Sequence, residues 1–102
     1  MPKPQLYLSA SARSDLDAIE DYIALQSDGV RAARVVDRIL SVCEAVASMP
    51  GIGRDRPDIK GHPRVLPVRP WLIFYEPLAD RRGVLVTRIV DGRRDLTNLD
   101  ED

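Results

Sequence analysis

The spacing of apolar residues changes its period once along this chain, and that change limits the possible folds more than any other feature. Before residue 50 the apolar positions recur every three or four residues, as on one face of a helix. After residue 64 they form short β-rich runs. Separate helical and strand patterns in two halves of a chain are typical of an α+β domain, in which helices cover one face of a sheet.

Two amphipathic helices are predicted in the first half. The first is expected over residues 10–26, after a Ser9 or Ser11 cap, and the second over residues 30–48, after a break at residues 27–29. Because three residues join them, they are expected to form an antiparallel hairpin. Each has one apolar stripe: Ala12, Leu16, Ile19 and Ile23 in the first, and Val36, Ile39, Leu40, Cys43, Val46 and Ala47 in the second.

Short strands are predicted around these helices. Pro70 and the polar stretch 77–83 separate the β-rich runs, so neighbouring runs are expected to pair antiparallel, with the nearly all-apolar second run in the centre. Pro67 has no N–H group, which predicts an irregular or solvent-facing edge for the first run. A further strand is predicted over residues 4–9. The three β-rich runs are residues 64–69, 71–76 and 84–90.

The predicted order is β-α-α-β-β-β, an α+β fold with a helical hairpin packed on a small, mostly antiparallel sheet. Residues 50–57 are too rich in Pro and Gly for any regular element, and a loop of about a dozen residues is often functional. We expect a single domain over residues 1–102, with residues 96–102 as a frayed acidic tail.

The net charge conceals a strong division along the chain. The total is 15 basic and 16 acidic residues, a net charge of -1, which excludes a bulk polycation. Residues 1–51 carry seven acids and five bases, residues 52–94 carry five acids and ten bases, and residues 95–102 carry four acids. The sheet-forming stretch is therefore basic, and we expect its surface to meet an acidic partner or a nucleic-acid complex.

The sequence also indicates where the protein is located and what roles a few individual residues have. The longest apolar run has five residues, no secretory signal is apparent and the one cysteine cannot form an internal disulfide, so we expect a cytoplasmic protein without a membrane span. Cys43 is predicted to be a small buried hydrophobe, and Tyr75 to bury its ring and hydrogen-bond its hydroxyl. His62 is predicted to be exposed and structural. We expect neither a metal site nor a cofactor.

Over nearly its whole length the chain resembles the ParE branch of the RelE/ParE superfamily, the toxin halves of bacterial toxin–antitoxin pairs. The resemblance lies in the joint order and spacing of several short motifs. It implies a toxin that poisons DNA gyrase and blocks replication. It also implies a ParD-like ribbon-helix-helix antitoxin that binds the toxin. In that complex the toxin would contact operator DNA only indirectly, through the antitoxin. The motifs are Ala12-x-x-Asp15-Leu16-x-x-Ile19-x-x-Tyr22-Ile23, Pro50-x-x-Gly53-x-x-Arg56, Arg64-x-x-Pro67-Val68, Leu72-Ile73-Phe74-Tyr75 and Arg88-Ile89-Val90-Asp91-Gly92-Arg93-Arg94-Asp95.

The RelE branch of the same superfamily cleaves messenger RNA on the ribosome, which needs a general base, a general acid and a cation. No His, Tyr or other aromatic follows Tyr75 here, and Asp91 stands where many members carry His. Arginines supply only the cation. We therefore expect a binding-type inhibitor without catalytic residues, with a RelE-like endonuclease and a non-toxic antitoxin-binding module as alternatives. The predicted target-contact residues are Arg64, Arg69, Trp71, Arg88, Arg93 and Arg94.

Overall fold

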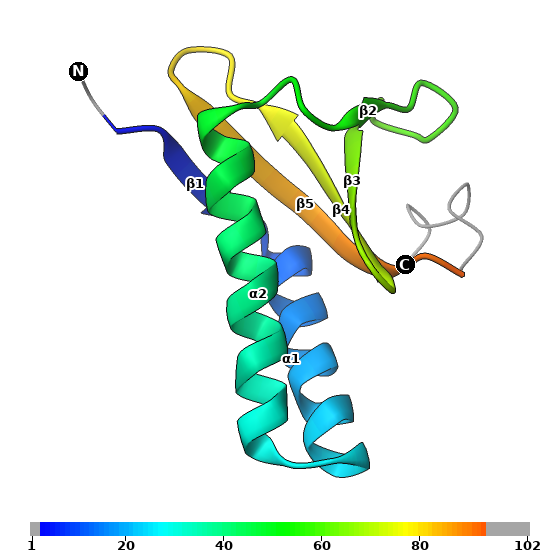
Figure 1. Cartoon of the computed structure of the whole chain (residues 1–102). Helices are drawn as coiled ribbons and strands as arrows, with labels where there is room; N and C mark the ends of the chain where they lie inside the picture. The colour runs from blue at the N-terminus through cyan, green and yellow to red at the C-terminus, as the bar shows by residue number, and fades with distance from the viewer. Residues whose placement is uncertain (1–2, 94–102) are drawn as a thin grey trace.

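A computed structural model describes residues 3–93 and shows a helical hairpin lying across one face of a five-stranded sheet (Figure 1). The strand order is β1-β5-β4-β3-β2, with β1 parallel to β5 and every other pair antiparallel. This confirms the α+β prediction and places β4 in the centre. The elements are β1 (Gln5–Leu8), α1 (Ala10–Gln26), α2 (Gly29–Ser48), β2 (Arg54–Asp55), β3 (Arg64–Val68), β4 (Trp71–Pro77) and β5 (Gly83–Asp91).

Side-chain caps determine where both helices begin. The Ser9 hydroxyl accepts a hydrogen bond from the backbone N–H of Ala12 (3.0 Å), and an Asp28 carboxylate oxygen accepts from that of Arg31 (2.7 Å). Each cap satisfies an N–H group that has no partner inside its own helix. Of the two predicted caps for the first helix, the structure uses Ser9. The second helix begins at Gly29, one residue earlier than predicted.

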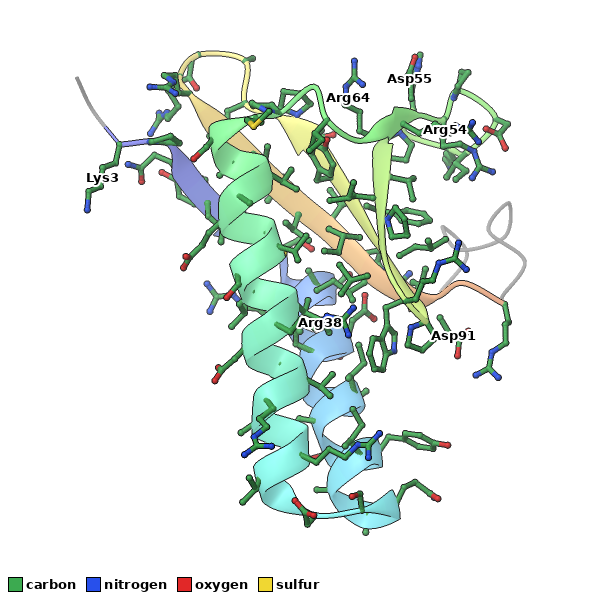
Figure 2. All side chains as sticks on the ribbon, in the orientation of Figure 1. Lys3, Arg38, Arg54, Asp55, Arg64 and Asp91 are labelled. Atoms are coloured by element: carbon green, nitrogen blue, oxygen red, sulfur yellow. The ribbon has the colours of Figure 1, made fainter. Side chains whose placement is uncertain are left out.

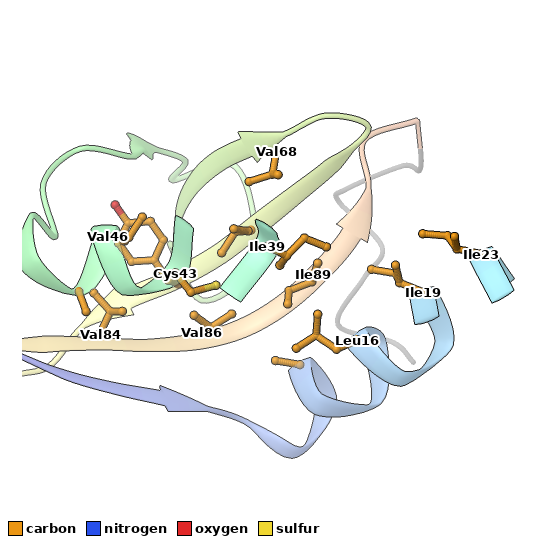
Figure 3. Packing of buried hydrophobic residues seen from close by; sticks show 14 of the residues in the cluster. Leu16, Ile19, Ile23, Ile39, Cys43, Val46, Val68, Val84, Val86 and Ile89 are labelled. Carbon is orange, nitrogen blue, oxygen red and sulfur yellow. The ribbon is translucent and has the colours of Figure 1, made fainter. Parts of the chain in front are cut away.

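The main core lies between the hairpin and the sheet (Figure 3). The predicted α1 stripe is buried, as are Ile39, Cys43, Val46 and Ala47 of α2. They pack against one face of β3, β4 and β5, including Val68, Ile73, Val84, Val86 and Ile89. Cys43 is completely buried, as predicted, and this burial raises the pKa of its thiol to about 11. The thiol is therefore protonated at neutral pH, as expected of a packing residue.

The segment after α2 is more regular than its composition predicts. Arg54 pairs with Val65, and Asp55 with Arg64, as the short edge strand β2. The prediction of no regular element is therefore wrong for these two residues. Their pairing partners lie about ten residues away in sequence, so a local excess of Pro and Gly does not reveal the pairing.

The exposed edge of β3 is formed at Pro67. The Arg56 N–H donates to the Pro63 carbonyl at 3.0 Å, so Pro63, Val65 and Pro67 direct their backbone groups away from β4. The pairing between β2 and β3 extends no further along β3 than Val65. Pro67 therefore lies beyond β2, on the outer edge of the described sheet. Proline has no N–H to offer an incoming strand, so this edge resists pairing with another chain.

A smaller apolar cluster covers part of the opposite face of the sheet. Ile59, from the loop between β2 and β3, packs with Val65, Phe74, Val90 and the half-buried Leu72. Within residues 3–93, no helix is long and apolar enough to cross a membrane. The predicted tail at residues 96–102 lies outside the described residues.

Candidate functional site

The structure brings three of the six predicted contact residues to one end of the sheet. Arg69 lies in the turn between β3 and β4, Trp71 opens β4, and Arg93 follows β5. Trp71 is paired with Asp91, and the Gly92 N–H donates to the Pro70 carbonyl at 2.8 Å, so the turn and the end of β5 are joined. Arg64 lies at the opposite end of the sheet from Asp91 (Figure 2). Arg94 lies outside the described residues.

A cleft of about 420 Å³ opens between α1 and this end of the sheet. Tyr22 and Trp71 supply aromatic surface, and Asp91 and Arg93 line the cleft beside them. We call it the α1–β5 cleft. The half-buried Trp71 also packs against the main core. Tyr22 is 64% exposed.

Asp91 and Arg93 form a local ion pair at the mouth of this cleft. One Asp91 oxygen accepts from the Arg93 backbone N–H and from its Nε, both at 2.9 Å, and the other accepts from Nη2 at 2.6 Å. The Arg93 side chain is 85% exposed. Hydrogen bonds from Arg93 lower the pKa of Asp91 to about 2, and Asp91 raises the pKa of the Arg93 guanidinium.

The Asp91 carboxyl is expected to titrate at about pH 2 in the folded protein rather than at its ordinary 3.8. Because the folded pKa is depressed, the contribution of the pair to stability is fully present above the unfolded pKa and is lost as pH falls through about 2. An NMR titration of the Asp91 carboxyl carbon measures this value. Arg93→Ala is expected to raise the pKa of Asp91 towards its ordinary 3.8. An Asp91 midpoint near 3.8 with Arg93 intact contradicts the pairing.

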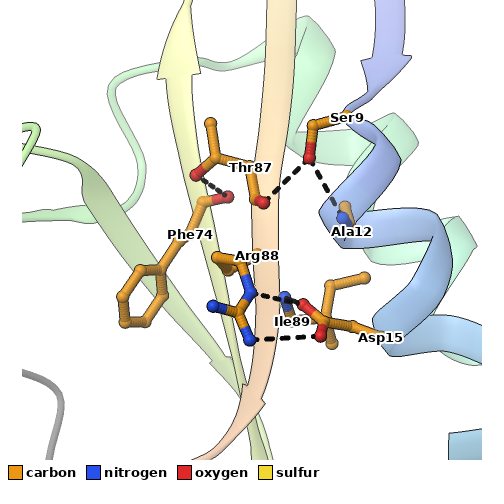
Figure 4. Close-up of polar contacts among 7 residues, drawn as sticks. All are labelled: Ser9, Ala12, Asp15, Phe74, Thr87, Arg88 and Ile89. Carbon is orange, nitrogen blue, oxygen red and sulfur yellow. Dashed lines mark hydrogen bonds and ion pairs between the residues drawn. The ribbon is translucent and has the colours of Figure 1, made fainter. Parts of the chain in front are cut away.

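Arg64 and Arg88 hold the fold together. Arg64 Nη1 donates to the Gly53 carbonyl at 2.8 Å and ties β3 to the segment before β2. Arg88 donates through Nε to one Asp15 oxygen at 2.9 Å and through Nη2 to the other at 3.3 Å (Figure 4). The Arg88 side chain is 18% exposed and the Asp15 side chain 17%, so this ion pair is largely shielded from water. The Arg88 charge is thus directed at α1.

The first turns of α1 continue the edge of β5 where β1 ends. Beyond Leu8, the Ser9 N–H donates to the Val86 carbonyl at 2.9 Å, and the Ser9 hydroxyl donates to that of Thr87 at 2.9 Å (Figure 4). One side chain therefore both caps α1 and completes the edge of a nine-residue strand that is paired with a four-residue neighbour.

Asp15 completes the same edge further along α1. Its Oδ2 accepts from the Ile89 N–H at 2.8 Å, in addition to the bonds from Arg88. The carboxylate therefore satisfies a strand N–H and a partly buried cation together. In sequence Asp15 looks like an ordinary acidic residue near a helix start, and the signal of its role is its fixed place between two core positions, Ala12 and Leu16.

Tyr75 fixes the segment between α2 and β2. Its ring is fully buried, its hydroxyl donates to the Pro50 carbonyl at 2.7 Å, and it accepts from the Gly53 N–H at 2.8 Å. This confirms the prediction of a buried ring with a bonded hydroxyl. Gly53 is required here because a Cβ at this position would lie 2.5 Å from the tyrosine oxygen.

Replacing Tyr75 by phenylalanine is expected to lower the free energy of unfolding by about 1–3 kcal/mol. The change leaves the buried Gly53 N–H and the part-buried Pro50 carbonyl without the hydroxyl that they both contact. Urea denaturation measures the effect. Tyr7→Phe is the matched control, because the Tyr7 hydroxyl accepts a hydrogen bond from Arg81 at 3.4 Å on the surface, and its loss is expected to cost less than about 0.5 kcal/mol. Equal effects of the two changes contradict the account.

His62 is exposed and faces a carboxylate. His62 Nε2 lies 2.9 Å from Asp55 Oδ1, and both side chains are more than half exposed. The exposure of His62 is as predicted. Residues 3–93 contain no group of three or more His, Cys, Asp or Glu side chains arranged to hold a metal ion.

A second hollow, of about 510 Å³, lies along α2 beside the outer part of β3. Its lining is mainly apolar, and two of its members, Met49 and Ile52, are 61% and 55% exposed. We call it the α2–β3 groove. Its other apolar members are Val42, Ala45, Val46 and Leu66.

Comparison with known proteins places this arrangement in a family. The family model for the ParE toxin of the type II toxin–antitoxin system parDE matches residues 6–96. The chain belongs to the ParE toxin family. Within it, the chain is similar to Toxin ParE3 of Caulobacter vibrioides, with 34% identity over 83 residues that cover 80% of each protein.

A solved structure shares the ParE-family fold. It is described as the chromosomal ParDE toxin–antitoxin system from P. aeruginosa, and its matching chain superposes with a TM-score of 0.71 at 23% identity. The match covers 87% of this chain and 96% of that one. The helical hairpin and the mixed sheet are thus shared with a chain from a ParDE system.

Proposed function

We propose that this ParE-family chain is a toxin that inhibits DNA gyrase, blocks replication in the cytoplasm and is neutralised by a cognate ParD-like antitoxin. The observation that carries the proposal is the family match, which runs from residue 6 to residue 96 and so includes every described element except the first residue of β1. The similarity to a curated protein named as a ParE toxin supports it.

The side-chain contacts support action by binding rather than by RNA cleavage. Cleavage needs an acid and a base placed beside a cation at the reacting phosphate. The His62 imidazole faces the Asp55 carboxylate at the exposed β2–β3 loop, and the Arg88 guanidinium faces Asp15. Each group is therefore paired with a carboxylate, and the two pairs lie in different parts of the fold, one in the β2–β3 loop and the other between α1 and β5, rather than in one cluster.

The contact surface proposed for the target is the end of the sheet that carries Arg69, Trp71 and Arg93. Arg69 and Arg93 are exposed cations, and Trp71 offers aromatic surface in the cleft between them and α1. Aromatic and arginine side chains are the residues most often dominant in protein interfaces. Arg64 and Arg88 belong to the same predicted set, and the structure gives both of them supporting contacts within the fold.

The antitoxin is proposed to place an apolar segment in the α2–β3 groove. Met49 and Ile52 are exposed there next to part-buried Val42 and Leu66, so an amphipathic helix could cover them with its apolar face. Contact with operator DNA would then be made only by the ribbon-helix-helix half of the antitoxin.

Expression with and without the adjacent open reading frame tests the proposal in cells. Expression alone is expected to arrest growth with filamentous cells and DNA damage, and co-expression of the neighbour is expected to restore growth. Mapping transcript ends on translating ribosomes separates the two branches of the superfamily, because codon-phased cuts would identify a RelE-like endonuclease. Growth without inhibition would identify a non-toxic antitoxin-binding module.

A further inference from the structure

The α1–β5 cleft has walls suited to a planar cation. Tyr22 and Trp71 both line it, together with the ring of Pro70. The faces of aromatic rings attract cations, and a guanidinium gains most because it also packs flat against a ring. At about 420 Å³ the cleft has room for a long side chain and part of the segment that bears it.

Acidic side chains lie in this cleft and on the helix that forms one of its walls. Asp15 and Asp91 both line it, and Asp15 is already matched by Arg88. Three further acids on exposed positions of α1, Asp17, Glu20 and Asp21, lie on the same helix. Charge complementarity therefore favours a basic segment over an acidic one.

Arg93 already shows how Asp91 holds a guanidinium. The carboxylate receives Nε on one oxygen and Nη2 on the other, the paired geometry that makes arginine–carboxylate contacts specific. Yet Arg93 is 85% exposed and only two residues away, and an exposed ion pair of this kind contributes little free energy. A guanidinium from outside that also contacted the aromatic walls would therefore displace it at little cost.

We propose that the α1–β5 cleft binds an arginine side chain from a basic segment of a protein partner, with Asp91 receiving its guanidinium in place of Arg93. Tyr22 and Trp71 supply the aromatic contacts, and the acidic outer face of α1 attracts the rest of the segment. Arg93 is in this view an internal competitor that occupies Asp91 until the partner arrives. This site is distinct from the proposed target contact, in which Arg69 and Arg93 meet an acidic surface, because here the Asp91 carboxylate receives the cation, and it does not depend on gyrase inhibition.

The full-length chain offers a built-in reporter, because Trp71 is its only tryptophan and lines the cleft. The probe is a short helical alanine–leucine peptide with arginines on one face, and its twin carries uncharged citrulline at every arginine position. The arginine peptide is expected to change the Trp71 fluorescence saturably and to bind about tenfold more tightly than the citrulline peptide. Its affinity is expected to fall as salt rises.

Two variants give opposite expected shifts. Asp91→Asn removes the charge that the guanidinium meets and is expected to weaken the arginine peptide by about tenfold while leaving the citrulline peptide unchanged. Arg93→Ala removes the competitor and is expected to strengthen binding of the arginine peptide several-fold. Circular dichroism melting of each variant confirms that the fold is intact before titration.

Three outcomes would overturn the proposal. Equal binding of the arginine and citrulline peptides, or no saturable binding of either, would show that the cleft does not recognise a guanidinium. Weaker binding of the arginine peptide to Arg93→Ala would show that Arg93 is not a competitor. Tighter binding of a matched glutamate peptide, lost in Arg93→Ala, would identify the cleft as an anion site.

Discussion

Replacing Asp15 by alanine is expected to lower the free energy of unfolding by about 3 kcal/mol, because it breaks two kinds of contact at once. The Ile89 N–H loses its acceptor at the edge of β5, and the Arg88 guanidinium, whose side chain is 18% exposed in the unchanged protein, loses the Asp15 carboxylate. Urea denaturation followed by circular dichroism measures the change. The expected loss of free energy is large because neither group is accessible enough for water to replace the lost partner fully.

Asp15→Asn is the control that separates the two contributions. The amide oxygen still accepts from Ile89, whereas the charge opposite Arg88 is gone, so the expected loss is roughly half of that for alanine. Asp17→Ala, on the exposed side of the same helix, is expected to change stability by less than about 0.5 kcal/mol. A loss below about 1 kcal/mol for Asp15→Ala would show that the contacts of Asp15 with Ile89 and Arg88 contribute little to stability.

Reversing the charges of Arg69 and Arg93 together is expected to weaken inhibition of gyrase by at least about tenfold, equivalent to about 1.4 kcal/mol. Both side chains are exposed at the end of the sheet, so the glutamates would repel an acidic target surface without disturbing the core. The concentration of purified chain that halves gyrase supercoiling measures the effect.

Arg31→Glu with Arg34→Glu is the matched control for this double variant. Both residues are exposed on α2 and do not line the α1–β5 cleft, and the change in net charge is the same. The control is expected to inhibit as the unchanged chain does. Full inhibition by the Arg69→Glu and Arg93→Glu variant, with an intact fold, would place the target contact elsewhere on the molecule.

The elements set by local signals could be predicted from the sequence. The period of Ala12, Leu16, Ile19 and Ile23 gave the buried face of α1, and the apolar run from Trp71 gave the central strand. These signals are reliable because periodicity and capping act within a few residues. The same holds for Cys43, whose place on a helical stripe predicted its burial.

The remaining features depend on contacts between distant parts of the chain. Arg88, one of the predicted contact residues, and its ion-pair partner Asp15 are 73 residues apart, so no local pattern reveals that this pair joins β5 to α1. The two-residue strand β2 and the α1–β5 cleft arise in the same way, from segments that meet only after folding. The sequence therefore predicts a basic surface, and the structure shows that some of its arginines contact other parts of the fold while others are exposed to solvent.

The central claim, that this ParE-family chain inhibits gyrase, is tested most directly by adding the purified chain to purified DNA gyrase and relaxed plasmid. We expect supercoiling to fall as the chain is added, with accumulation of cleaved DNA, and we expect a stoichiometric amount of the co-purified antitoxin to abolish both effects. Unchanged supercoiling and cleavage at every concentration, with a chain that is folded and arrests growth in cells, would contradict it.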